Sequence, residues 1–293
     1  MMAGFWTRFK ADKVALVTAA FLGIVILLSL FAPIIAPYYP AHQDVADKFA
    51  PPSAEHWLGT DQLGRDILSR ILWGGQITVL WSLAAMFCTI SIGIVLGVVA
   101  GYFRGWVDEA IMRVCDIMLS FPNEVLILAI IGVMGTGIFN ILLAMVIAKW
   151  AWYVRMIRSI VIQFMDKNYI CFARVSGCSA RHIICHHLLT GALGEICVLA
   201  TLDAGGIILN ISALSFLGLG VQPPAAEWGM MLNEAKRVLI MNPWQMLPPG
   251  FAIFLVVAAF NFLGDSIQEA LDPQMDKSGK KHLSIFTRKK AVA

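Results

Sequence analysis

The chain has 293 residues, of which 59% are hydrophobic and only 14% are charged. Soluble domains are about 45–50% apolar and about 25% charged, so this balance excludes an ordinary soluble enzyme and indicates a protein that crosses a membrane several times. The formal net charge of +3 is small and scattered, which argues against a nucleic-acid partner. Six cysteines lie in or beside apolar segments without the pattern of a disulfide framework, which predicts reduced thiols.

The N-terminal third predicts one membrane crossing. Residues 1–13 carry three basic side chains and are expected on the cytoplasmic side. Residues 14–36 are uncharged and long enough for a first transmembrane helix. Residues 37–77 follow as an extracytoplasmic segment. Within it, Asp61 with Arg65 and Asp66 with Arg70 are spaced as i, i+4 ion pairs of a surface helix.

Residues 78–270 are expected to hold five further transmembrane helices. The second helix covers about 78–101 and carries Gly93, Gly97 and Gly101 at four-residue spacing, a stripe that lets another helix pack closely. The fifth helix covers about 188–214 and the last begins near Leu247.

The middle of the chain, residues 122–155, fits either one long helix or two short helices that fold back at Gly135-Thr136-Gly137. With two helices, 16 Lys and Arg residues lie on the side of the N-terminus and 5 on the other side; with one helix these numbers become 7 and 15. The positive-inside rule therefore favours six helices with both termini in the cytoplasm, including a basic cytoplasmic tail over residues 271–293.

A cytoplasmic segment, residues 153–187, is the longest connection between two helices on that side. It begins as an amphipathic helix, and Gly177 is expected to bend the chain before a second short helix. A connector of this length exceeds what packing needs and is suited to docking a soluble partner.

Two carboxylates of the fifth helix are candidates for the transport pathway. Asp203 lies near its middle, where a charge costs about 2.5–3.5 kcal/mol and must face protein or water. It either lines a pathway or hydrogen-bonds a neighbouring helix. Glu195 is a weaker candidate, because it lies nearer the cytoplasmic interface.

Four side chains between the fourth and fifth helices have metal-ligating groups. Thiols and imidazoles at this helical spacing suit Ni, Cu or Zn, although ordinary packing or solvation accounts for them as well. They are Cys178, His182, Cys185 and His186. The sequence has no phosphate-binding loop, zinc-hydrolase motif or nucleophile turn, so we expect a transport subunit that is not an enzyme and has no cofactor of its own.

Several stretches resemble one family of transport proteins. The segment from Cys171 to Thr190 is similar to the cytoplasmic coupling motif of binding-protein-dependent ABC importer permeases, matching it at Ala173, Gly177 and Leu189. Three further stretches resemble the C-type permeases of the peptide and nickel importer family: residues 56–70, residues 215–229, and Leu271-Asp272-Pro273. The resemblance implies an all-α, six-helix, type I ABC importer permease fold in the bacterial inner membrane.

The resemblance also implies partners and the residues that meet them. A second permease would complete the path, two ATP-binding subunits would supply energy, and a soluble substrate-binding protein would deliver cargo. The positions of the coupling motif, where the ATP-binding subunits would dock, are Cys171, Phe172, Ala173, Gly177 and Leu189. The candidates for facing the binding protein are Asp61, Arg65, Glu227 and Trp228.

The cargo is inferred from two stretches, residues 149–159 and 199–203, which look more like the nickel branch of the family than its peptide branches. Nickel or a nickel chelate is therefore the predicted cargo, with dipeptides or oligopeptides as the alternative. A stand-alone secondary transporter or channel is the competing class; it would be expected to show inverted repeats or broken midplane helices.

Overall fold

The computed structural model describes residues 2–271, and this part of the chain is helical without a β-strand. The predicted all-α class is confirmed. The predicted basic tail lies, except for Leu271, outside the described residues.

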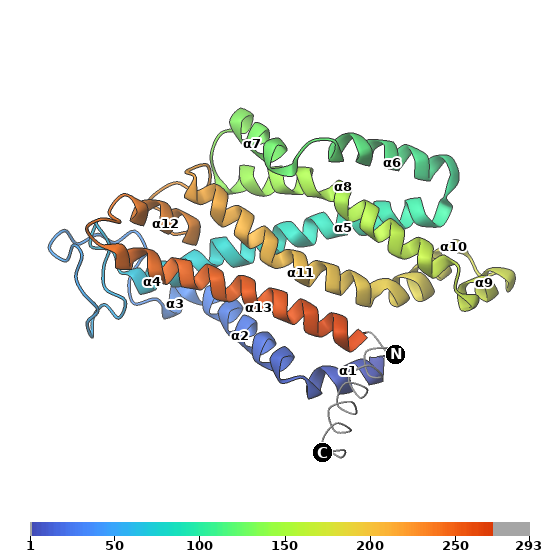
Figure 1. Cartoon of the computed structure of the whole chain (residues 1–293), viewed down its shortest axis with the longest axis horizontal. Helices are drawn as coiled ribbons and strands as arrows, with labels where there is room; N and C mark the ends of the chain where they lie inside the picture. Colours follow the sequence, from blue (N-terminus) through green and yellow to red (C-terminus); the bar gives the residue numbers. More distant parts are fainter. Residues whose placement is uncertain (1, 272–293) are drawn as a thin grey trace, which may run out of the picture.

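Four long helices run lengthwise through the molecule (Figure 1). They are α5 (Ser82–Phe103), α8 (Ile138–Met165), α11 (Leu189–Phe216) and α13 (Leu247–Leu271). One end of this bundle, called here the α9 end, carries α9 (Asn168–Val175) together with α1 (Met2–Ala11) and the end of α13. The opposite end, the α12 end, carries α12 (Trp228–Lys236) and the irregular segment 36–66.

The N-terminal helices cover α13. Helix α1 (Met2–Ala11) is followed by α2 (Lys13–Leu30) and the short α3 (Ala32–Ile35). Helix α2 begins at Asp12, whose carboxylate accepts a hydrogen bond from the Val14 amide at 2.8 Å, as an N-cap residue does. Buried Leu22 of α2 joins the apolar cluster formed by Ile253, Val256 and Phe260 of α13.

The second span is longer than the sequence suggested. Helix α4 (Ile67–Gly75), the π-helical turn η1 (Gln76–Trp81) and α5 form one continuous 37-residue helix. It begins at Ile67, where Asp66 caps it by accepting from the Ser69 amide at 2.7 Å. The expected start near residue 78 is therefore corrected by eleven residues, because a capping carboxylate determines where the helix begins.

Between α5 and α8 the chain forms a bent pair of helices. Helix α6 (Gly105–Leu119) and α7 (Asn123–Met134) meet at an angle of 79° around Pro122. Together they return the chain from the α9 end to the α12 end (Figure 1). The sequence analysis placed the third helix within residues 122–155, but residues 105–119 before it are helical as well. The charged residues of α6 interrupt the apolar run by which the other spans were predicted.

The glycine stripe of α5 does pack against α8. A Cβ atom at Gly93 would lie 2.6 Å from Tyr153 Cβ, and one at Gly97 would lie 2.9 Å from the Val154 carbonyl oxygen. Only glycine permits such close approach of two helices. This expectation from the sequence is confirmed.

The number of spans agrees with the prediction. Within residues 2–271, five helices are long and apolar enough to cross a membrane, and the α6–α7 pair gives a sixth if it counts as one span. Large apolar side chains on the outside, such as Phe87, Val95 and Phe254, are exposed. An outer surface of this kind suits contact with lipid.

Candidate functional site

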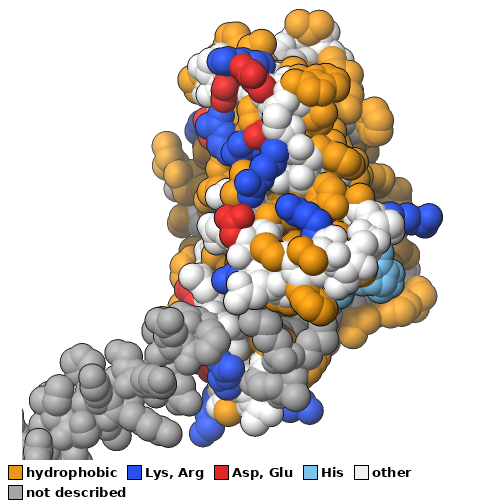
Figure 2. Space-filling view, turned by 90° about the vertical axis from the view of Figure 1, so that its right-hand side faces the viewer, with side chains coloured by type: hydrophobic (Ala, Val, Ile, Leu, Met, Phe, Trp, Pro, Cys, Tyr) orange, Lys and Arg blue, Asp and Glu red, His pale blue; other side chains and the backbone are white. Residues whose placement is uncertain are grey.

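A short helical corner at the α9 end projects from the ends of α8 and α11. It consists of α9, Gly177, α10 (Ala180–His182) and the π-helical turn η2 (Ile183–Leu188), which runs directly into α11. We call residues 168–188 the corner. In Figure 2, which faces this end, apolar and basic side chains lie side by side and histidines gather at one edge.

Gly177 ends α9 in the left-handed conformation, with φ +79°. The Cys178 amide donates to the Ala173 carbonyl and the Gly177 amide donates to the Arg174 carbonyl, both at 3.1 Å. This is the Schellman arrangement, in which glycine satisfies the last carbonyls of a helix. The bend predicted at Gly177 is therefore present.

The inner face of the corner is fixed to both long helices. Buried Ile170, Ala173, Ile183 and Leu188 share one apolar cluster with α8 and with the start of α11. A displacement of the corner therefore acts on α8 and α11, because a packed apolar contact transmits movement rather than absorbing it.

The outer face of the corner is exposed and apolar. Phe172 is 74% exposed and Val175 is 87% exposed on an eight-residue helix. Of the positions predicted for coupling, Cys171 and Phe172 are exposed, Ala173 is buried and Leu189 is half-buried. The five positions lie on or beside the corner, where Ala173 anchors it and Phe172 points outward.

The predicted metal ligands do not come together as a metal site. The rings of His182 and His186 stack at 4.5 Å between centroids, while Cys185 is exposed. Across residues 2–271, no group of three or more His, Cys, Asp or Glu side chains is placed to hold a metal ion.

A polar cluster lies halfway along α8 and α11. Lys149 Nζ donates to both carboxylate oxygens of Asp203, at 2.7 and 2.9 Å, and the Tyr153 hydroxyl donates to Asp203 Oδ2 at 2.5 Å. Asp203 is 13 residues from the end of α11 at Phe216, which corresponds to about 20 Å. We call these three residues the midspan triad. Tyr153, which the sequence placed at the start of the cytoplasmic segment 153–187, thus lies within α8, which continues to Met165.

In the midspan triad the Asp203 carboxylate accepts hydrogen bonds from α8, and a hydrogen bond to a neighbouring helix is one of the two roles that the sequence left open for it. Lys149 and Tyr153 were not predicted from the sequence as partners of Asp203. The available signal was a lysine within one apolar helix and an aspartate within another, because opposite charges at membrane depth seek each other. Glu195, the weaker pathway candidate, is exposed on α11 nearer the α9 end.

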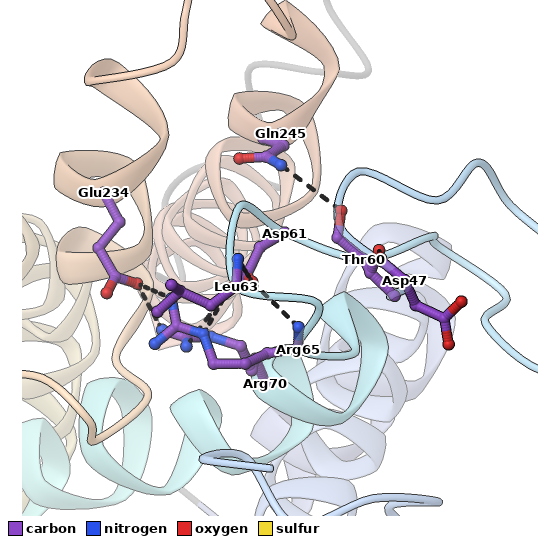
Figure 3. Close-up of polar contacts among 8 residues, drawn as sticks. All are labelled: Asp47, Thr60, Asp61, Leu63, Arg65, Arg70, Glu234 and Gln245. Atoms are coloured by element: carbon purple, nitrogen blue, oxygen red, sulfur yellow. Dashed lines mark hydrogen bonds and ion pairs between the residues drawn. The ribbon is translucent and has the colours of Figure 1, made fainter. Parts of the chain in front are cut away.

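The α12 end is held by a buried ionic cluster (Figure 3). Arg65 Nε donates to Asp61 at 2.6 Å, and Arg65 Nη2 donates to Glu234 at 2.9 Å. Arg70 Nη2 donates to the same Glu234 oxygen at 2.6 Å. Both arginine side chains are only 1% exposed. We call these four residues the ionic clasp, because they join the start of α4 to α12.

The ionic clasp corrects the predicted surface helix. Residues 61–66 form a turn rather than a helix, and the Asp61–Arg65 pair is buried within it. Asp66 does not pair with Arg70: it caps α4 and its carboxylate lies 3.0 Å from His56 Nδ1. The i, i+4 spacing predicted a pair with Asp66, whereas Arg70 lies 2.6 Å from Glu234 of α12 and 3.5 Å from Asp61.

Glu227 and Trp228 are buried beside the ionic clasp. Glu227 caps α12 by accepting from the amides of Gly229 and Met230, at 3.0 and 2.8 Å, and burial raises the pKa of its carboxyl. Trp228 Nε1 donates to the Ile71 carbonyl at 2.8 Å. A Cβ atom at Gly74 would lie 2.7 Å from the Trp228 ring, so glycine is required there.

The four residues predicted to face a binding protein are therefore corrected. Asp61, Arg65, Glu227 and Trp228 are all buried, because they hold the two segments of the α12 end together. They can position a docking surface but do not form it. The exposed side chains at this end are others, including Trp57, Ile240, Met241 and Trp244.

Two family profiles match the chain. The profile described as "Binding-protein-dependent transport system inner membrane component" matches residues 93–277. The profile of the "N-terminal TM domain of oligopeptide transport permease C" matches residues 1–52. This chain belongs to the family of binding-protein-dependent transport system inner membrane components. It is a permease subunit of an ABC importer, and the alternative of a stand-alone secondary transporter or channel is set aside.

Individual relatives agree with this assignment over almost the whole permease. The nickel transport system permease protein NikC of Escherichia coli K12 is 39% identical, covering 90% of this chain and 94% of the relative. The metal-staphylopine import system permease protein CntC of Staphylococcus aureus NCTC 8325 is 43% identical, covering 93% and 94%. The dipeptide transport system permease protein DppC of Alkalihalophilus pseudofirmus is 40% identical, covering 92% and 88%.

A solved structure shares the fold. The inward-facing MetNI methionine ABC transporter contains a chain that aligns with a TM-score of 0.58 and 16% identity, covering 70% of the permease and 98% of that chain. The predicted ABC importer permease fold is thus confirmed.

Proposed function

We propose that this permease imports nickel in chelated form, working with a second permease subunit, two ATP-binding subunits and a soluble substrate-binding protein. The membership in a binding-protein-dependent family supports these partner classes. Similarity to a nickel permease and to a metal-staphylopine permease supports a metal cargo. The chain itself supplies the conduit and takes the energy of ATP hydrolysis from its partners.

The observation that carries the mechanism is the two-sided corner. Its exposed face, with Phe172 and Val175, is available to an ATP-binding subunit. Its buried face, with Ile170 and Ile183, packs on α8 and α11. When the ATP-binding subunits close, the corner moves as a lever, and α8 and α11 carry that movement to the middle of the membrane.

The proposed partners also imply an orientation of the permease in the membrane. The α9 end, with both described ends of the chain, faces the cytoplasm, where the ATP-binding subunits act. The positive-inside rule, which predicted most Lys and Arg residues on the side of the N-terminus, supports this orientation. The α12 end faces outward and receives the binding protein. The membrane is the bacterial inner membrane.

Cysteine labelling tests the orientation. Cys171 and Cys185 are exposed at the α9 end. A variant that keeps only Cys171 is expected to resist a membrane-impermeant maleimide in intact cells and to react after the membrane is opened. A matched variant with a single cysteine in place of exposed Trp57, at the α12 end, is expected to react in intact cells. The reverse pattern would refute the mechanism.

Uptake measurements test the cargo. Cells that express the complete transporter are expected to accumulate radioactive nickel, and cells that lack only this chain are not. Dipeptide import is the second candidate, since the dipeptide permease is as similar as the nickel permease. If deletion of this chain abolishes dipeptide uptake and leaves nickel uptake unchanged, the nickel assignment is wrong.

A further inference from the structure

The two charged groups of the midspan triad have different numbers of hydrogen-bond partners. Asp203 accepts from two donors on α8, Lys149 and Tyr153, whereas the Lys149 ammonium has Asp203 as its partner among the described residues. If the ammonium moved to another anion, Asp203 would keep its hydrogen bond from Tyr153. The carboxylate is therefore fixed in place, and the lysine is the more readily exchanged member of the pair.

The midspan triad is also incompletely buried. The side chains of Lys149 and Asp203 are 13% and 19% exposed, at a depth of about 20 Å from either end of α11. A charged group at this depth cannot face lipid without a cost of several kcal/mol, so its exposed part must face water or protein. In the assembled transporter the exposed part of the ion pair therefore faces either a water-filled path or another subunit.

The face of α11 next to Asp203 is polar and open. Gly206, one turn further along, has no side chain beside the carboxylate, whereas an added Cβ there would lie 3.5 Å from Asp203 Oδ1, in van der Waals contact with it. Asn210 lies two turns from Asp203 on the same face and is half-buried. Its amide makes no hydrogen bond to another described residue. This face continues the polar surface from the midspan triad toward the α12 end.

We propose that Lys149, Asp203 and Tyr153 form a cargo site in the translocation path for compounds that bear a carboxylate but have no net negative charge, such as zwitterionic peptides and neutral amino-acid chelates of a metal ion. The proposal rests on the import function proposed above and narrows its cargo class. The cargo carboxylate takes the place of Asp203 on the Lys149 ammonium. Asp203, oriented by Tyr153, receives the ammonium or amide donors of the cargo.

The exchange of the cargo carboxylate for Asp203 on Lys149 explains why the site favours cargo without a net negative charge. Binding replaces one ion pair by equivalent contacts and leaves the net charge at midspan unchanged, so the cargo can bind weakly and leave again. A bare divalent cation would release Asp203 from Lys149 and leave the ammonium unpaired beside it, which costs several kcal/mol. The site therefore favours a chelate over free nickel.

The test uses the complete transporter in proteoliposomes, with its second permease, ATP-binding subunits and binding protein. The probes are radioactive alanyl-alanine and radioactive nickel supplied as its glycine chelate. The measured quantity is the number of cargo molecules imported per ATP hydrolysed. In the double variant Lys149→Gln with Asp203→Asn, which keeps side-chain size and charge balance, we expect this ratio to fall at least tenfold for each probe that the wild type imports.

Two further variants separate a cargo site from a structural ion pair. Tyr153→Phe removes only the hydroxyl and is expected to lower the ratio about threefold. Arg155→Gln with Asp116→Asn removes a partly exposed ion pair between α8 and α6 and is expected to leave the ratio within twofold of the wild type. ATP hydrolysis stimulated by the loaded binding protein, and the melting temperature of the complex, are expected to stay unchanged in all variants.

The outcomes distinguish this site from the proposed function. If the wild type imports neither probe in an ATP-dependent way, the import function itself fails. If the wild type imports a probe and the double variant does so at the same ratio, only the cargo site is refuted. A parallel fall in melting temperature and ATP hydrolysis in the double variant would also refute the cargo site, because the pair would then be structural.

Discussion

The two ends of the permease are built on opposite principles. At the α12 end, the ionic clasp buries two arginines against carboxylates of different segments. At the α9 end, the corner has an exposed apolar face and depends on one glycine turn and a few buried aliphatic side chains. The first arrangement fixes segments of the same chain to one another, and the second leaves a surface for another chain. A rigid α12 end and an exposed corner at the α9 end suit a permease that is moved by a partner bound on one side of the membrane.

The largest effect is expected from breaking the ionic clasp. Glu234→Ala leaves the guanidinium groups of Arg65 and Arg70 without their shared acceptor, and removal of one member of a buried ion pair costs about 3–5 kcal/mol. We expect a clear loss of melting temperature for the purified permease in detergent. Glu109→Ala, which breaks the exposed Glu109–Arg113 pair, is the matched control and should melt like the wild type. Equal melting of both variants would show that the clasp does not hold the α12 end.

A smaller effect is expected where α5 meets α8. Gly97→Ala places a methyl group 2.9 Å from the Val154 carbonyl oxygen, and such overpacking costs about 1–3 kcal/mol. Gly132→Ala, in α7, adds the same group where nothing lies within 4 Å and should not destabilise. The melting temperatures of the two variants check this contrast. If Gly97→Ala melts like Gly132→Ala, the two helices are not as close as described.

Gly177→Val tests whether the glycine turn of the corner is needed for transport. A β-branched residue in the left-handed conformation costs about 1–2 kcal/mol locally, so the end of α9 should rearrange while the six spans stay inserted. We expect cargo uptake to fall several-fold at nearly normal protein levels in the membrane. Gly177→Asn is the control, because asparagine tolerates this conformation, and it should retain most of the uptake. Undiminished uptake by Gly177→Val would argue against the corner as the lever.

The smallest effect on stability is expected from Phe172→Ala. The side chain is 74% exposed, so its removal should change the free energy of unfolding by less than about 0.5 kcal/mol. Co-purification of the ATP-binding subunits with the permease should nevertheless be strongly reduced. Val133→Ala, which truncates another exposed side chain far from the corner, should leave co-purification intact. Normal assembly of Phe172→Ala would contradict the assignment of the docking face.

Much of the corner could be predicted from the sequence, whereas the α12 end could not. Gly177 was recognised because a glycine after a short amphipathic helix has a local reason to be there. The carboxylate that accepts a hydrogen bond from Arg70 lies 164 residues away in Glu234, and no local rule indicates such a partner. The i, i+4 rule gave the Asp61–Arg65 contact but also suggested a surface helix, since spacing carries no information about burial.

Membrane crossings were predictable for a similar reason, and so was the turn at residues 135–137 between α7 and α8, whereas helix α6 was not. Runs of apolar residues fixed five of the six spans, because the bilayer demands length and composition. Helix α6 was not predicted, because it carries acidic and basic side chains. Among them is Asp108, which pairs with Arg158 of α8. Only the neighbouring helix makes those charges acceptable.

By itself, the sequence determined the class of the protein, the number of spans, the close packing of α5 on α8 and the bend at Gly177. These depend on hydrophobicity, charge bias and backbone freedom, which are properties of short segments. Tertiary structure alone decided that Lys149 meets Asp203 and that Arg70 meets Glu234. The energy of a buried charge depends on which distant group lies within hydrogen-bonding distance, and folding sets that distance.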